Sequence, residues 1–175
     1  KTKYALYMDS DVKFKKNRFD EFLIYAKKIN DFIILAPQHE KNKYEKNFIS
    51  PKLNNHKNLI LMKMVHGHFL FFQIKNVKKV GYYDEKIFLY YDETDYCLRA
   101  YRKNQKIYVI PKIKVFHQGG TSVNINNKIE VEINKHWHYM WSKFYFYKKN
   151  YSSLFAYKKT ISDLFKISFK LFFFL

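Results

Sequence analysis

Two kinds of apolar pattern alternate in the first part of the chain. Residues 4–8 form an uninterrupted apolar run, which predicts a buried strand over residues 3–8. Residues 17–29 have apolar positions at helical spacing, and Asn17 is suited to cap the predicted helix. Residues 32–36 form a second buried strand that we expect to stop at Pro37. The order strand, helix, strand predicts an α/β fold.

The middle of the chain has a long segment without periodicity, followed by short predicted elements. Residues 39–58 are polar and have no periodicity, which predicts a long surface loop. After this loop the pattern predicts strands, a turn and one further helix. These elements are strands over residues 59–65 and 68–74, a turn over 75–80, a helix over 92–104, and strands over 106–110 and 113–116 separated by Pro111.

From about residue 127 the pattern is helical in two pieces, with a break near residues 150–153. We therefore expect an α/β domain over residues 1–123 and a helical extension over residues 124–175. One face of the last helix is apolar and the other carries lysines, a pattern typical of helices that lie in a membrane interface. Packing of that helix on its own domain is the alternative. The apolar face consists of Leu154, Tyr157, Ile161, Leu164, Phe165, Leu171 and Phe172.

The high positive charge of the chain bears on the class of partner that it could bind. The formal net charge is +18, which favours an anionic partner: nucleic acid, an acidic membrane or a phosphorylated substrate. A lysine-rich solvated surface explains the charge equally well. Cys97 is the single cysteine, which excludes an internal disulfide framework and a cysteine-built zinc site. No uninterrupted apolar run approaches the roughly 20 residues that span a bilayer.

Asp9 and Asp11 directly follow the first predicted strand. Carboxylate oxygens are ligands that Mg²⁺ and Mn²⁺ favour, and Mg²⁺ commonly binds one or two carboxylates together with substrate phosphates. The alternative is a turn in which aspartate side chains accept hydrogen bonds from free backbone amides.

A second group of acids begins the helix predicted over residues 92–104. Asp92 is suited to be its N-cap, and Glu93 and Asp95 suit the positive end of the helix dipole. A carboxylate here can also act as a general base if it reaches an acceptor hydroxyl. Arg99, further along the helix, is a candidate partner that keeps these acids ionised. His117 ends the last predicted strand and can ligate a metal or contact phosphate.

Taken in order, these segments resemble family 2 glycosyltransferases, most closely the rhamnosyltransferase-like bacterial branch. That family has a strand-ending Asp-x-Asp, a Gly-x-Phe/Tyr-Asp-Glu segment, an acidic helix start and a late histidine. The matching segments here are Asp9-Ser10-Asp11, Gly81-Tyr82-Tyr83-Asp84-Glu85, Asp92-Glu93-Thr94-Asp95 and His117. The resemblance covers about two-thirds of the chain, residues 3–122, and implies the C-terminal part of a GT-A mixed-sheet fold followed by helices.

The resemblance also implies roles for individual residues. Asp9 and Asp11 match the pair that binds a divalent cation, Mg²⁺ or Mn²⁺, and the nucleotide-sugar diphosphate. His117 matches the late histidine that contacts the metal or the diphosphate. Glu93 falls at the usual catalytic position and Asp92 just before it, so either is the base, with Glu93 favoured by position. The supporting positions are Gly67, below the acceptor site, and Asp95 and Arg99.

The implied activity is transfer of a sugar from a nucleotide donor to a glycan or lipid-linked glycan acceptor, in bacterial surface polysaccharide or glycolipid synthesis. We expect it to be metal-dependent and inverting. The implied location is the cytoplasm, peripheral at the inner face of the plasma membrane. Nothing matches the nucleoside-binding strand and loop that open the family's fold, so we expect an N-terminally truncated fragment that alone binds nucleotide sugar poorly.

Two rival functions come from other classes. A basic, aromatic-rich chain is compatible with nucleic-acid binding, but the lysines are spread along the chain and no nucleic-acid motif is present, so we expect no nucleic-acid partner. Clustered acids also serve metal-dependent phosphodiesterases.

Overall fold

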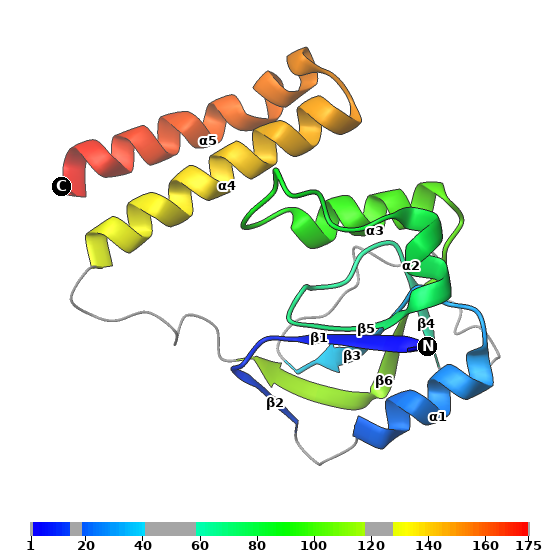
Figure 1. Ribbon diagram of the computed structural model, residues 1–175. Coiled ribbons are helices and arrows are strands. Elements are labelled where there is room, and N and C mark those ends of the chain that lie inside the picture. The colour runs from blue at the N-terminus through cyan, green and yellow to red at the C-terminus, as the bar shows by residue number, and fades with distance from the viewer. Residues whose placement is uncertain (1, 15–18, 41–58, 118–127, 175) are drawn as a thin grey trace. The chain divides into compact units, whose positions relative to one another are not determined.

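The computed structural model describes residues 2–14, 19–40, 59–117 and 128–174 (Figure 1). The chain divides into two compact units. The first contains Lys1–Tyr82 and Tyr96–Thr121, and the second contains Tyr83–Asp95 and Ser122–Leu175. The second unit thus combines the C-terminal helices with residues 83–95, a segment that lies within the domain predicted over residues 1–123. The α/β class is confirmed, with strands and helices around a mixed sheet.

The first unit is built on one mixed sheet. Its strands are β1 (Tyr4–Met8), β2 (Val12–Phe14), β3 (Ile34–His39), β4 (Ile60–Met62), β5 (Phe69–Gln73) and β6 (Ile107–His117). They follow the order β1-β5-β3-β6-β2, and β4 also pairs with β6. β5 runs antiparallel to β1 and β3, and β3 runs parallel to β6. Consequently β1, β3 and β6 end at the same edge of the sheet, where β5 begins.

Helices cover both faces of this sheet. Alternate side chains of a strand point to opposite faces, so Ile34 and Leu35 of β3 belong to different core clusters. Leu35 packs with Phe22 of α1 (Phe19–Ile29). Ile34 packs with α2 (Ile74–Val80) and with Tyr96, Cys97 and Ala100 of α3 (Asp92–Arg102). Figure 1 shows α1 on the side of the sheet opposite α2. The buried thiol of Cys97 is part of this core.

Strand β1 is present but is not buried, contrary to the sequence-based prediction. Leu6, Tyr7 and Met8 are 39%, 53% and 45% exposed. β1 lies at the end of the strand order and pairs with β5, so one of its long edges has no neighbouring strand among the described residues. A continuous apolar run predicts a strand but does not distinguish a central strand from an edge strand.

Two strands continue through prolines at which we expected them to stop. β3 passes Pro37 and ends at His39, and β6 passes Pro111, so the two predicted strands around Pro111 are one. The β3–β6 register shifts between Pro37, opposite Ile110, and Gln38, opposite Lys114. Prolines are accommodated at such irregularities because the ladder there does not need every N–H group. His39 therefore ends a strand rather than beginning a loop.

Other elements agree with the prediction to differing degrees. The helices expected over residues 17–29 and 92–104 are confirmed as α1 and α3. Residues 75–80, expected as a turn, belong to the short helix α2, and β2 was not predicted. The proposed cap Asn17 and most of the expected loop, residues 41–58, lie outside the described residues.

The second unit contains the helices α4 (Lys128–Asn150) and α5 (Ser153–Phe174), with the break where the sequence predicts it. They pack against each other through an ion pair between Lys143 and Asp163 and through the rings of Phe144 and Tyr157, 5.1 Å apart. The segment before α3 packs on α4, where the hydroxyl of Ser142 donates to the carbonyl oxygen of Leu89 at 2.7 Å. No helix among the described residues is both long and apolar enough to cross a membrane.

Candidate metal centre

The strand order brings the candidate metal ligands together. β1 and β2 lie at opposite ends of the strand order, so residues 9–11 connect them at the edge where β6 ends. The N–H group of Asp9 donates to the carbonyl oxygen of His68 at 3.0 Å, and that of Val12 donates to the carbonyl oxygen of Asp9 at 3.2 Å. Val12 also pairs with His117 in the β2–β6 register. Backbone hydrogen bonds thus contribute to holding this turn.

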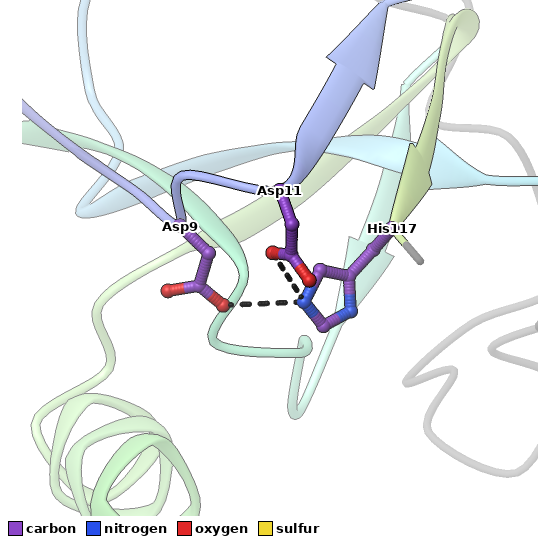
Figure 2. A group of neighbouring side chains, drawn as sticks. All are labelled: Asp9, Asp11 and His117. Atoms are coloured by element: carbon purple, nitrogen blue, oxygen red, sulfur yellow. Dashed lines mark ion pairs between the residues drawn. The ribbon is translucent and has the colours of Figure 1, made fainter. Parts of the chain in front are cut away.

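The carboxylates of Asp9 and Asp11 face the imidazole of His117 (Figure 2). Nε2 of His117 lies 3.0 Å from Oδ1 of Asp11 and 3.5 Å from Oδ2 of Asp9. One ligand atom from each of the three residues lies within 4.8 Å of the others, and all three side chains are half-buried. These atoms can form ion pairs when His117 is protonated, or they can hold a divalent cation when it is neutral.

Three further histidines that were not predicted as site residues lie beside this group, one of them stacked on His117 and two next to that one. The rings of His68 and His117 stack at 5.2 Å, and His39 and His66 lie 5.2 Å and 6.0 Å from His68. Nε2 of His68 is buried and has no hydrogen-bond partner among the described residues. The signal in the sequence was the pair His66 and His68 flanking Gly67, directly before a predicted strand.

Burial and neighbouring imidazoles lower the pKa values of two histidines of this cluster, His66 and His68. Burial, followed by the proximity of His39, His117 and His66, lowers the pKa of His68 to about 3. Burial and the same kind of neighbours also lower the pKa of His66. Positive charge is therefore disfavoured on His66 and His68.

The acidic start of α3 lies in the second unit. The first helical hydrogen bond runs from the N–H of Asp95 to the carbonyl oxygen of Tyr91. Tyr91 is therefore the N-cap, and Asp92, which we expected to be the cap, is the first helical residue. Asp92 and Glu93 are both half-buried in the first turn.

A strained turn precedes these acids. Tyr90 and Tyr91 have φ angles of 64° and 63°, a left-handed conformation that is uncommon for residues other than glycine. The ring of Tyr91 packs against Phe146, 5.3 Å away, and against Tyr139. Burial and the nearby Tyr139 raise the pKa of Tyr91. Aromatic packing thus holds a conformation that the local backbone disfavours, and such positions are common at functional sites.

Asp95 is a buried ion-pair partner. Its carboxylate accepts hydrogen bonds from Nζ of Lys149 at 2.8 Å and from the side chain of Asn150 at 3.2 Å. Lys149 also donates to Asp84 at 2.8 Å. Lys149, distant in sequence, was not predicted as a partner of these acids.

Arg99 and Gly67 lie in the first unit. The guanidinium group of Arg99 donates to the carbonyl oxygens of Val80 and Tyr82 at 3.2 Å and 2.8 Å, and it stacks 5.0 Å from the ring centre of Tyr96. Arg99 thereby connects α3 to the last residue of α2 and to Tyr82. Gly67 is in the turn between the two histidines, two residues before β5 begins.

The structure therefore gathers Asp9, Asp11 and His117 at one edge of the sheet, and it adds His68 behind them. The candidate bases Asp92 and Glu93 form a separate group in the second unit. No protein-family model matches this chain, and neither does any curated protein.

Proposed function

We propose that this protein is a metal-dependent glycosyltransferase of the family 2 type with a GT-A fold. It transfers a sugar from a nucleoside-diphosphate sugar to an acceptor hydroxyl in bacterial surface polysaccharide or glycolipid synthesis, with inversion. The observation that carries the proposal is the convergence of Asp9, Asp11 and His117 where parallel strands end. In open α/β sheets, ligands commonly bind at the carboxyl ends of the strands.

On the donor side, the two carboxylates and the imidazole of His117 fit Mg²⁺ or Mn²⁺. A bound cation of this kind supplies positive charge that offsets the negative charge on the departing diphosphate. Asp9 and Asp11 hold their oxygens at the sheet edge because the turn between β1 and β2 is fixed by backbone bonds. The stack of His68 on His117 restricts the orientation of the imidazole.

On the acceptor side, Glu93 or Asp92 accepts the proton of the acceptor hydroxyl. The hydroxyl oxygen forms a bond to the anomeric carbon, and the bond from that carbon to the diphosphate oxygen breaks. Glu93 is the preferred base. Asp95 pairs with Lys149, and Arg99 bonds the carbonyl oxygens of Val80 and Tyr82. The position of Gly67 below the acceptor site rests on the family resemblance.

The test is release of nucleoside diphosphate from a panel of nucleotide sugars by the full-length protein, measured with and without Mn²⁺ and an acceptor glycan. The expected result is Mn²⁺-dependent release accompanied by product glycoside, and its loss in Asp11→Asn. Mn²⁺-dependent hydrolysis of bis(p-nitrophenyl) phosphate without sugar transfer would instead identify a phosphodiesterase. Failure of Mn²⁺ to promote binding of any nucleoside diphosphate would refute the proposed donor site.

A further inference from the structure

Helix α5 has small residues on its inner side and large apolar residues on its outer side. Ala156 and Thr160, spaced one turn apart, are buried. The exposed residues are Leu154 (66%), Tyr157 (61%), Ile161 (52%), Leu164 (53%) and Phe165 (69%). A helix on the surface of a globular protein usually shows the opposite arrangement, with its large apolar stripe turned inward. The side chains of Leu171 and Phe172, which belong to the same predicted face, lie outside the described residues.

Helix α4 contributes a second apolar row. Ile133, Trp137 and Trp141 are 39%, 67% and 48% exposed. They follow one another at intervals of one helical turn, so they share one side of α4, and Phe144 lies one turn further on the same side. The ring of Phe144 contacts the ring of Tyr157 at 5.1 Å. This contact joins the row of α4 to that of α5 as one apolar face of the hairpin, which we call the hairpin face.

The charges beside the hairpin face are basic. Lys158, Lys159 and Lys166 of α5 and Lys148 of α4 are exposed. Asp163 is the one acidic residue of the sequence from Ser153 to Leu175, and it is paired with Lys143. Exposed negative charge is therefore absent from the described part of α5, in a chain whose net charge is +18.

We propose that the hairpin face docks on an anionic lipid surface, with α4 and α5 lying in the plane of the membrane interface. Apolar side chains enter the acyl boundary, and lysines keep their ammonium groups at the level of the anionic headgroups. Trp137 and Trp141 suit this position, since tryptophan concentrates at membrane–water interfaces. The proposal does not depend on the transferase activity, because it rests on the second unit alone.

The test uses the full chain and co-sedimentation with vesicles of equal parts phosphatidylglycerol and phosphatidylcholine, compared with phosphatidylcholine alone. The expected result is binding to the anionic vesicles that weakens as NaCl is added. The two tryptophans of the chain both lie in the hairpin face, so their fluorescence should shift to shorter wavelength and become shielded from acrylamide. Absence of binding, or binding without a change at the tryptophans, would overturn the proposal.

Matched substitutions test the face itself. Phe165→Asp and Ile161→Asp each place a charge within the hairpin face, and Ser162→Asp places the same charge at an exposed position beside it. We expect the first two to weaken partitioning into anionic vesicles at least about tenfold, the size expected when one large apolar side chain is no longer buried. Ser162→Asp should have a much smaller effect. All three positions are exposed, so circular dichroism should show unchanged folding.

Two results would contradict the proposal. Equal weakening by Phe165→Asp and Ser162→Asp would show that charge alone attracts the chain to the vesicles. A dimer in sedimentation equilibrium without lipid, dissociated by Phe165→Asp, would show that a second copy of the chain covers the hairpin face.

Discussion

Nζ of Lys149 lies 2.8 Å from the buried carboxylate of Asp95 and 2.8 Å from the carboxylate of Asp84. One lysine of α4 therefore pairs with an acid of the segment before α3 and with an acid of its first turn. The backbone between these two acids contains the left-handed residues Tyr90 and Tyr91 and the candidate bases Asp92 and Glu93. The ion pairs hold both ends of that segment on one helix.

Replacing Lys149 with methionine should destabilise the protein by about 3 kcal/mol, because it leaves the buried charge of Asp95 without its cationic partner. Lys148→Met is the matched control. Lys148 is the exposed neighbour on the same helix, and its loss should change the free energy of unfolding by less than about 0.5 kcal/mol. Urea unfolding followed by circular dichroism measures both values. Equal effects of the two substitutions would show that the Lys149 pairs do not stabilise the fold.

The stability of the protein should fall in acid partly through Asp84. Burial alone would raise the pKa of this carboxyl, but hydrogen bonds from Lys149, the backbone of Lys86 and Tyr145 outweigh it and lower the pKa. A lowered folded-state pKa stabilises the protein above the unfolded value of about 3.9, and the contribution is lost as the pH falls through the lowered pKa.

The matching experiment compares Asp84→Asn with the native chain in urea unfolding at a series of pH values. We expect the variant to be less stable at neutral pH and the difference to shrink as the pH falls below about 3.9. Glu85→Gln changes the exposed neighbouring carboxylate and serves as the control. A difference that is constant across the acid range would mean that Asp84 acts through packing rather than through its charge.

Asp11→Asn should weaken Mn²⁺ binding by at least about tenfold, since even changes to groups behind metal ligands have effects of that size. The amide keeps the shape of the side chain and removes one negative charge. Asp20→Asn makes the same charge change at an exposed position of α1 and should leave Mn²⁺ affinity unchanged. Calorimetric titration with Mn²⁺ measures both. Unchanged affinity in Asp11→Asn would exclude this carboxylate as a ligand.

Glu93→Gln should lower kcat for sugar transfer by about 10²- to 10⁴-fold, the range typical for loss of a general base. Its Mn²⁺ affinity should stay at the native value, because Glu93 is not one of the three grouped ligands. Asp92→Asn should have a smaller effect on kcat. Steady-state kinetics of nucleoside diphosphate release measures both variants, and the opposite order of losses would assign the base to Asp92.

Local patterns predicted the elements whose own residues specify them. Helix α3 and the break between α4 and α5 follow from apolar spacing and from the polar residues 150–153. Strand β1 was predicted as a strand but with the wrong burial, because burial depends on neighbours that its own residues do not specify. The strands through Pro37 and Pro111 were predicted to stop, because the register shift that accommodates them belongs to a pair of strands.

Some features of the candidate site were likewise visible in the sequence, and others appear only in the tertiary structure. The strand-ending Asp9 and Asp11 and the late His117 were visible as residue types at strand ends. The sequence did not show that His39 lies beside the pair His66 and His68, or that His68 stacks on His117, because the strand order brings these residues together. The pairing of Lys149 with Asp95 depends in the same way on how α4 packs beside the start of α3.

By itself, the sequence determined the α/β class, the long helices and the residue types available for chemistry, because periodicity and residue type act over a few neighbouring positions. The tertiary structure decided which of those residues meet. Asp11 lies 3.0 Å from His117 because an edge strand, a turn across the sheet end and a parallel strand converge there. The same level of structure decided that α5 turns its large apolar residues outward, since the face that a helix buries depends on what packs against it.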